Sequence, residues 1–390
     1  MLIWAPRVSQ VFPVFSRIAA AVSLPDVTKL FEPTPKGVIN FGIGEPDFPP
    51  TEQAAKGLKQ AVDRGRNKYV HTQGLPKLRE ALSKRLIVHD KAMHASNILV
   101  TASATQGLSL AALTFYADGD EVLIPDPGFF YYRPHVKMMS AVPLPYGLTA
   151  ERGFQPDLEE IKSLITPATK AIVVNSPSNP MGSSMDEKTV KGIADIANDK
   201  NMIVVSDEVY SDLCYDGPHQ TFLGKCEKLV YINSFSKIYA LTGWRIGYMA
   251  AKPEMFGALA KMLFLTMGCV SEPMQYGALA ALRTPKTEIK RRREVYRRRR
   301  DTMVEALKAI PSATLVKPTG AFYAFPSFAT KEGLTSQELA AEMLKGGARV
   351  TSGIQFGANG EGHIRLSYSL SPQQIKKGVE RIGKVAAQLA

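Results

Sequence analysis

Short β-rich segments alternate with helical segments between Asn97 and Ala250, and this alternation constrains the fold more than any other feature of the sequence. Valine, isoleucine and leucine dominate the β-rich segments, which read NILVT, DEVLIP, KAIVVNS, NMIVVSDEVY, KLVYINS and WRIGYMAA. Helical patterns such as QGLSLAALTFY and MDEKTVKGIADIANDK lie between them. Near-continuous apolar strands that alternate with helices are typical of a mostly parallel sheet covered on both faces. The sequence therefore predicts an α/β domain.

The pattern changes after about residue 285, where shorter strands and helices mix. A long helical stretch is followed by ATLVKPTGAFYAFPSF, SQELAAEMLKG, ARVTSG, GHIRLSYSL and a last helical segment that begins at SPQQ. Such a mixture favours a smaller α+β domain. We expect residues 46–285 to form the large domain, and residues 286–390 to form an interdomain helix and a small C-terminal domain. Residues 1–45 are expected to complete the small domain.

The composition is that of an ordinary globular protein, with 45% hydrophobic and 22% charged residues among 390. No apolar run approaches the roughly 20 residues that a membrane span needs. The three cysteines, Cys214, Cys226 and Cys269, form no CxxC pair, which favours a reducing, cytoplasmic compartment and argues against a metal site. The first 15 residues are apolar but broken by prolines, so we expect a loosely attached extension and no signal peptide.

The net charge of +12 is concentrated in one place. Residues 290–300, KRRREVYRRRR, hold eight cations and one anion. No zinc-finger spacing or RNP-like aromatic motif accompanies this run, so nucleic-acid binding is not favoured. We expect the basic residues to coat the solvent face of a long helix.

Polar residues follow three of the apolar segments, at the point where each predicted strand ends. KAIVV is followed by NSPSNPMG, NMIVV by SDEVY, and KLVYI by NSFSK. In an open α/β sheet the ligand binds at the carboxyl ends of the strands. Each residue alone is better explained as a turn or cap residue. Together they predict a site that contains Asn179, Asp207, Tyr210, Ser234, Ser236 and Lys237, with Arg245 close by.

The chain resembles the class I aminotransferases, which are pyridoxal-phosphate (PLP) enzymes of fold type I typified by aspartate aminotransferase. The resemblance covers about Gly42 to Leu370, in order and with similar spacing. It is carried by GEPDFPP, KYVHTQGLPKLREAL, ILVTASATQGL, DGDEVLIPDPGFFYY, NSPSNPMG, SDEVYSDL, SFSKIYALTGWRIGY and GHIRLSYS. The combination of SxxK, an arginine eight residues later and NPxG ahead of DExY is specific.

The resemblance implies roles around the cofactor ring. Lys237 would form the internal aldimine with PLP, and its freed amine would then move the substrate's α-proton. Asp207 would pair with the pyridinium nitrogen and keep it charged. Asn179 and Tyr210 would hydrogen-bond the ring's 3′ oxygen, and Phe129 would stack on the ring.

The resemblance also implies a phosphate site at the start of a helix, where free backbone N–H groups favour an anion. Ser103, Ala104 and Thr105 would line it, and Ser234 and Arg245 would complete it. Many relatives carry glycine where Ser103 stands. Tyr69 matches a tyrosine that reaches the phosphate of the neighbouring subunit, which implies a homodimer with shared active sites.

For the substrate, Arg365 resembles the arginine that holds the α-carboxylate of the amino acid. Gly44 would be a close-approach glycine near that carboxylate, on a segment that could close over the site. Aspartate-specific relatives of one branch have a lysine where this chain has Thr105. Substitutes for that cation could come from His71, Lys77 or Arg133, so aspartate, aromatic, alanine or broad specificity stays open.

The implied reaction is a ping-pong exchange in which an L-amino acid gives its amino group to a 2-oxo acid, 2-oxoglutarate in our prediction. One alternative is a lyase or synthase of the same fold, such as a carbon–sulfur lyase or an aminocyclopropane-carboxylate synthase. Another is a transcriptional regulator with an aminotransferase-like body. Since 43 residues precede Gly44, we expect no added winged-helix domain.

Overall fold

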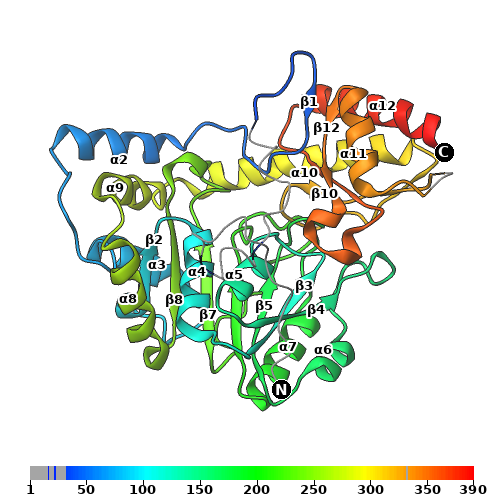
Figure 1. Cartoon of the computed structure of the whole chain (residues 1–390). Helices are drawn as coiled ribbons and strands as arrows, with labels where there is room; N and C mark the ends of the chain where they lie inside the picture. The colour runs from blue at the N-terminus through cyan, green and yellow to red at the C-terminus, as the bar shows by residue number, and fades with distance from the viewer. Residues whose placement is uncertain (1–15, 17–21, 23–31, 331–332) are drawn as a thin grey trace.

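The computed structural model describes residues 32–330 and 333–390, together with Ser16 and Val22. The expected N-terminal extension, and with it most of the segment 1–45, lies outside the described residues. The described chain forms two lobes, one around a large sheet and one around several short strands, with the helix α10 (Lys286–Lys308) running between them (Figure 1).

Seven strands form the large sheet. Their order is β2 (Ile98–Thr101), β8 (Gly247–Ala251), β7 (Leu229–Ser234), β6 (Ile203–Asp207), β5 (Thr169–Asn175), β3 (Glu121–Asp126) and β4 (Val142–Gly147). The last five run parallel, and β8 runs antiparallel to both of its neighbours. The predicted α/β fold with a mostly parallel sheet is confirmed. Only β4 was not predicted, because its sequence VPLPYG carries two prolines that an edge strand tolerates.

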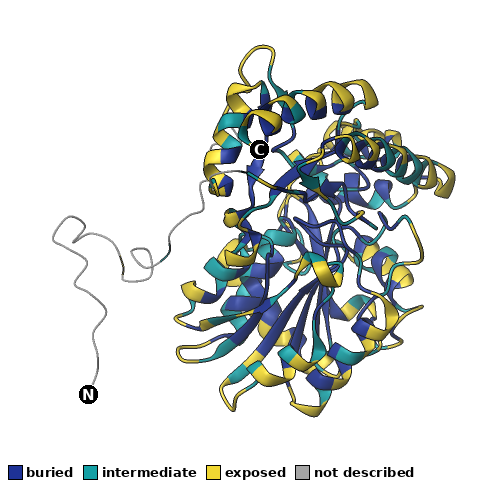
Figure 2. Cartoon of the chain, turned by 90° about the vertical axis from the view of Figure 1, so that its right-hand side faces the viewer, coloured by how far each residue is buried: buried dark blue, intermediate teal, exposed yellow. Residues whose placement is uncertain are grey.

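Helices cover both faces of this sheet, as its apolar strands require. Buried side chains of α4 (Ala104–Phe115), α5 (Tyr132–Met138) and α8 (Pro253–Met267) pack on one face. Those of α3 (Pro76–Leu86), α6 (Leu158–Leu164) and α7 (Glu187–Asp199) pack on the other. In Figure 2 the strands lie in a buried centre beneath helices whose outer faces are exposed. Beside the sheet, α2 (Glu52–Asp63) packs against α9 (Glu272–Ala281).

The second lobe is built from short strands and two further helices, α11 (Ser336–Lys345) and α12 (Pro372–Leu389). β1 (Ile39–Asn40) pairs in parallel with β12 (Ala348–Arg349), which joins the start of the described chain to this lobe. The other strands form two small antiparallel sheets, β10 (Tyr323–Ala324), β14 (Ile364–Ser367) and β13 (Thr351–Ser352), and β11 (Ser327–Phe328) with β9 (Ala313–Thr314). The 3-10 helices are η2 (Ala95–Asn97), η3 (Ala150–Arg152), η4 (Thr242–Trp244), η5 (Gly353–Phe356) and η6 (Ala358–Gly360).

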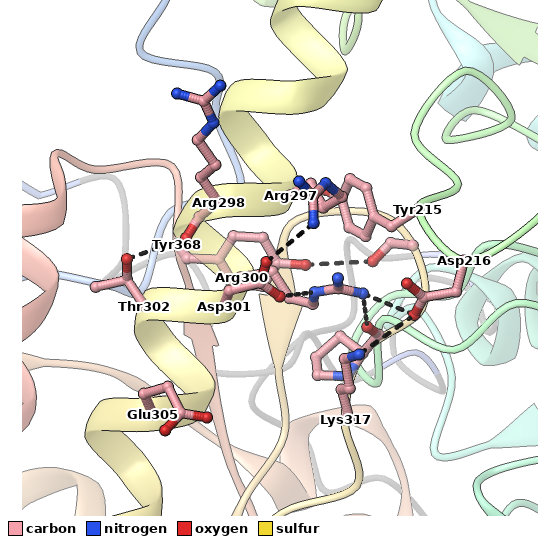
Figure 3. Close-up of polar contacts among 12 residues, drawn as sticks. Tyr215, Asp216, Arg297, Arg298, Arg300, Asp301, Thr302, Glu305, Lys317 and Tyr368 are labelled. Atoms are coloured by element: carbon pink, nitrogen blue, oxygen red, sulfur yellow. Dashed lines mark hydrogen bonds and ion pairs between the residues drawn. The ribbon is translucent and has the colours of Figure 1, made fainter.

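The basic run lies on α10, but the expectation that all its charges face solvent is wrong. Arg298 is exposed, whereas Arg292, Arg299 and Arg300 are buried. The side chain of Arg300 is only 2% exposed, and it bonds Asp216, Asp301 and the carbonyl of Pro318 (Figure 3). Arginine is tolerated inside a protein when carboxylates and carbonyls satisfy its fork of donors. Three of the eight basic residues therefore join α10 to its neighbours.

Among the described residues, no helix combines the length and the apolar character that crossing a membrane requires. The same residues contain no group of three or more histidine, cysteine or acidic side chains placed to hold a metal ion.

Candidate active site

A cavity of about 510 Å³ opens at one edge of the large sheet, where the second lobe meets it. Strand register explains why functional side chains gather there. Asn175 pairs with Asp207, and Gly247 pairs with both Ser234 and Thr101, so several strands end or begin at this edge. The cavity is lined by thirteen of the fourteen predicted site residues: Gly44, Ser103, Ala104, Thr105, Phe129, Asn179, Asp207, Tyr210, Ser234, Ser236, Lys237, Arg245 and Arg365.

Lys237 lies in the loop between β7 and η4, with its amine inside the cavity. Its Nζ donates to the carbonyl oxygen of Gly44 at 2.8 Å and lies 5.5 Å from the ring centre of Tyr210. Burial lowers the pKa of this amine to about 8, and the positive charge of Arg365 adds to that effect. A substantial share of the amine is therefore neutral, and hence nucleophilic, slightly above neutral pH.

Asp207 ends β6 and is almost fully buried. Burial raises the pKa of its carboxyl group to about 6, although a hydrogen bond from Tyr132 opposes the shift. The Tyr132 hydroxyl donates to Oδ2 at 2.8 Å, while Oδ1 receives only a long contact of 3.4 Å from the backbone of Val209. One carboxylate oxygen is thus held by the protein, and the other keeps capacity to accept a hydrogen bond.

Asn175 and Asn179 connect the backbone of Asp207 to Arg365. Asn175 donates from its side chain to the backbone oxygen of Asp207 at 2.9 Å and accepts from the backbone of Asn179 at 2.9 Å. The side-chain oxygen of Asn179 then accepts from Arg365 at 3.1 Å. Arg365 is buried, and its Nε has no partner among the described residues. A buried guanidinium donor without a partner is costly, so it is suited to an anionic ligand.

The start of α4 borders the cavity and contains a strained residue. Ser103 is the N-cap, with φ 128° and ψ 166°, and its side chain accepts from the backbone of Gln106. This backbone region is almost restricted to glycine, so a serine there costs about 1–3 kcal/mol. Opposite it, a Cβ on Gly247 would lie 2.8 Å from the backbone nitrogen of Ala104. Glycine at 247 therefore keeps the first backbone N–H groups of α4 clear.

Three further polar groups border this helix start. Ser234 and Ser236 are buried, with their hydroxyl oxygens 2.7 Å apart. Arg245 follows η4 in the left-handed backbone region and donates to the carbonyl of Thr242 at 2.9 Å. A helix N-terminus, two hydroxyls and a guanidinium provide donors and positive potential suited to a phosphate.

The second lobe contributes Tyr323, which the sequence did not single out. Its hydroxyl lies 2.8 Å from that of Tyr210, and its ring lies 4.9 Å from the Arg365 guanidinium carbon. A Cβ on Gly44 would lie 2.1 Å from the Tyr323 hydroxyl, which explains why glycine occupies position 44. The nearest contacts of Gly44 are thus Tyr323 and Lys237, while the neighbouring Gly42 accepts from Arg365.

Tyr69 is the one predicted residue outside this cavity, and it is 98% exposed. The possible substitutes for a lysine at position 105 are outside it as well. Arg133 borders a neighbouring cavity and lies 3.5 Å from Asp126, whereas His71 and Lys77 are exposed. Within the described part of the chain, the cations that line the cavity are Lys237, Arg245 and Arg365.

A large, mostly parallel sheet with a buried lysine and acid at its carboxyl edge, facing a buried arginine of the second lobe, is typical of an α/β enzyme that handles small anionic substrates. Residues 36–382 match the family model described as "Aminotransferase class I and II". A probable aspartate/prephenate aminotransferase of Aquifex aeolicus is 37% identical over 96% of this chain and 98% of its own length.

Solved structures agree in fold. An aspartate aminotransferase double mutant of Thermus thermophilus superposes with a TM-score of 0.89 at 30% identity, over 95% of this chain and 99% of that one. An aromatic aminotransferase of Pyrococcus horikoshii gives 0.86 at 33% identity, over 93% and 99%. The chain belongs to the class I and II aminotransferase family, and it is an aminotransferase. The family uses pyridoxal phosphate.

Proposed function

We propose that this enzyme binds PLP covalently through Lys237 and transfers amino groups between an L-amino acid and a 2-oxo acid in two half-reactions. The observation that carries the proposal is the buried amine of Lys237, whose pKa is lowered to about 8 by burial, inside a cavity that also holds Asp207 and Arg365. When bound, the cofactor supplies an electron sink and a carrier for the amino group.

The donor set of the cavity fits this cofactor. The start of α4, with Ser234 and Arg245, suits its phosphate, and Gly247 leaves the backbone of that helix start accessible. The less occupied oxygen of Asp207 suits a protonated ring nitrogen. Asn179 and Tyr210 have polar groups at the cavity wall for the ring oxygen, and Phe129 offers a flat face.

The chain's own groups then perform the binding and proton-transfer steps. Arg365, with its unpartnered Nε, holds the substrate α-carboxylate, and Asn179 orients the guanidinium through its 3.1 Å hydrogen bond. Lys237 takes a proton from the substrate's α-carbon and, with PLP bound, would deliver it to the C4′ carbon of the cofactor, which its pKa of about 8 favours. In the structure its Nζ is held inside the cavity by the carbonyl of Gly44.

We propose aspartate or an aromatic amino acid as the donor and 2-oxoglutarate as the acceptor, because relatives of similar identity are named for aspartate or aromatic substrates. Position 105 is a threonine, and the three cavity cations all have other assigned roles. Phe129, Phe130 and Tyr131 line the same cavity, and these rings favour an aromatic side chain.

We also propose a homodimer, in which Tyr69 reaches the phosphate site of the partner subunit. Its support is an exposed apolar surface near the cavity: Phe264 and Leu265 are more than 60% exposed on α8, and Gln106 of α4 contacts Met267 there. We retain the domain division 1–45, 46–285 and 286–390, supported by the pairing of β1 with β12. Three free cysteines support a cytoplasmic location.

The decisive experiment replaces Lys237 by alanine. The variant should lose the cofactor mass that borohydride reduction fixes to the chain, and its transamination rate should fall by a factor of 10³ or more, roughly the range seen when a catalytic group is removed. Lys225→Ala is the matched control, because that partly buried lysine donates to the carbonyl of Thr221 outside the cavity. A Lys237→Ala enzyme that works at the wild-type rate disproves the assignment.

A panel of amino acids, with and without 2-oxoglutarate, then ranks the substrates. Turnover that continues without any 2-oxo acid would identify a lyase of the same fold instead. The absorbance of the bound cofactor reports each half-reaction separately.

A further inference from the structure

Two inward-facing arginines of α10 contact residues 47–49, which directly follow a segment that lines the active site, residues 42–45. This segment makes several contacts within the site. The carbonyl of Gly42 accepts from Arg365 and from the hydroxyl of Thr351, the latter at 3.2 Å. The carbonyl of Gly44 accepts from Lys237 at 2.8 Å. Any displacement of residues 42–45 therefore moves the partners of both the lysine and the arginine.

The residues that follow this segment are bound to α10. Both terminal nitrogens of Arg299 lie 2.7 Å from the two carboxylate oxygens of Asp47, in a bidentate pair. The guanidinium carbons of Arg292 and Arg299 lie 5.0 Å and 5.4 Å from the ring centre of Phe48. Arg292 also donates to the carbonyl of Pro49 at 3.0 Å. Two arginines about two turns apart on one helix thus hold three consecutive residues.

The connection between these two sets of contacts is short and stiff. Asp47 lies three residues after Gly44, at most roughly 10 Å of extended chain. Pro46 lies between them and fixes its own backbone angle, and it restricts Glu45 as well. A displacement of Asp47 should therefore also displace Gly44.

We propose that Arg299 and Asp47 are positioning residues of the aminotransferase reaction, which hold residues 42–45 against Lys237 and Arg365. The proposal rests on the proposed function of that site. The pair acts on the position of the segment more than on global stability, because the Asp47 side chain is 39% exposed and an ion pair that is solvated on one side contributes less to the free energy of unfolding than a fully buried one. Loss of the pair should therefore loosen the segment in a protein that remains folded.

The test compares the purified holoenzyme with the variants Arg299→Gln, Asp47→Asn and the double variant. Arg298→Gln is the matched control, because Arg298 is the adjacent arginine and its side chain is 73% exposed. Each single variant should raise the KM for the amino acid about tenfold with kcat changed less than about twofold, since α-carboxylate binding is shared by ground and transition states. Hydrogen exchange of the backbone amides between Gly42 and Phe48 should be faster by about tenfold.

The double variant should be no worse than the single ones, because both remove the same contact. The proposal is overturned if Arg299→Gln and Asp47→Asn match Arg298→Gln in KM and in exchange, or if their effects add. If Arg299→Gln does not fold, the KM and the hydrogen exchange of Asp47→Asn decide the question, because Asp47 is the partly exposed residue of the pair. If the wild-type enzyme does not transaminate, the proposed function fails, and exchange of residues 42–48 still tests the pair alone.

Discussion

Burial, more than the identity of the residues, sets the chemistry of the two central ionisable groups. The same loss of solvent that lowers the pKa of the Lys237 amine to about 8 raises that of the Asp207 carboxyl to about 6. Both pKa values are thereby brought closer to neutral pH. This favours proton transfer by Lys237, and it makes the charge of Asp207 sensitive to a ring nitrogen placed beside it. Tyr132 limits the shift of Asp207, because its hydroxyl favours the charged carboxylate.

Replacing Tyr132 by phenylalanine should change the pH dependence of stability in the apoenzyme. The folded state holds the Asp207 proton more tightly than the unfolded chain, so this group's contribution to stability is present at about pH 4 and is lost as pH rises toward 6. Without the hydroxyl the pKa rises further, and the loss continues above pH 6. In urea unfolding, the free energy of unfolding of Tyr132→Phe should be lower than that of the wild type by about 1.5–3 kcal/mol at pH 8 and by about 0.5–1.5 kcal/mol at pH 4.

The matched control for this measurement is Tyr116→Phe. Burial alone raises the pKa of Tyr116, so no charged partner faces its hydroxyl. The loss of unfolding free energy in Tyr116→Phe should therefore be the same at both pH values. Lys237 and Glu208 also face Asp207, and their contributions cancel when each variant is compared with the wild type. A pH-independent deficit in Tyr132→Phe would show that the hydroxyl does not act on the carboxylate.

Residues at strand ends could be predicted from the sequence, whereas their supporting side chains could not. Lys237, Asp207 and Asn179 follow apolar runs, and parallel strands bring such positions together whatever the details of packing. Tyr323 meets Tyr210 across 113 residues of sequence, from a two-residue strand of the other lobe. Nothing local to Tyr323 indicates that contact. Asn175 had the same strand-end signal as Asn179 and could have been found.

At the scale of elements, α10 shows why a charge pattern alone misleads. Its run of arginines predicts a solvated helix, yet the burial of each arginine depends on which carboxylates and carbonyls its neighbours present. Asp47, Asp216 and the carbonyl of Pro318 come from three separate segments. The sequence therefore predicts that this helix exists, but it does not show which of its faces is buried.

Arg300→Ala should be much more destabilising than Arg298→Ala, although the two arginines are two residues apart on α10. Arg300 loses bonds to Asp216, Asp301 and Pro318 and its contact with the Tyr215 ring (Figure 3). Because the two carboxylates remain partly solvated, we expect a loss of about 2–3 kcal/mol, below the 3–5 kcal/mol of fully buried pairs. Arg298→Ala should change the free energy of unfolding by less than about 0.5 kcal/mol. Equal losses by chemical denaturation would contradict this reading of the helix.

At the scale of the whole molecule, the active site combines residues from segments that lie far apart in the sequence. The large sheet supplies Lys237 and Asp207, the second lobe supplies Arg365 and Tyr323, and the segment at 42–45 lies between them. Tyr69 is left without a role in its own subunit's cavity, and it is almost fully exposed. The proposed homodimer would give this exposed aromatic side chain a role in the second subunit.

A subunit-mixing experiment tests that explanation. Tyr69→Phe should weaken cofactor binding by about tenfold or more, because a hydrogen bond to a charged phosphate is worth about 1.5–3 kcal/mol. Inactive Lys237→Ala subunits are then mixed with Tyr69→Phe subunits at limiting cofactor. If Tyr69 serves the partner, each hybrid regains one complete site, formed by Lys237 of one subunit and Tyr69 of the other, and activity rises above that of either parent. If Tyr69 serves its own subunit, or if the enzyme is monomeric, mixing restores nothing. Size-exclusion chromatography with light scattering of the same samples separates those two outcomes.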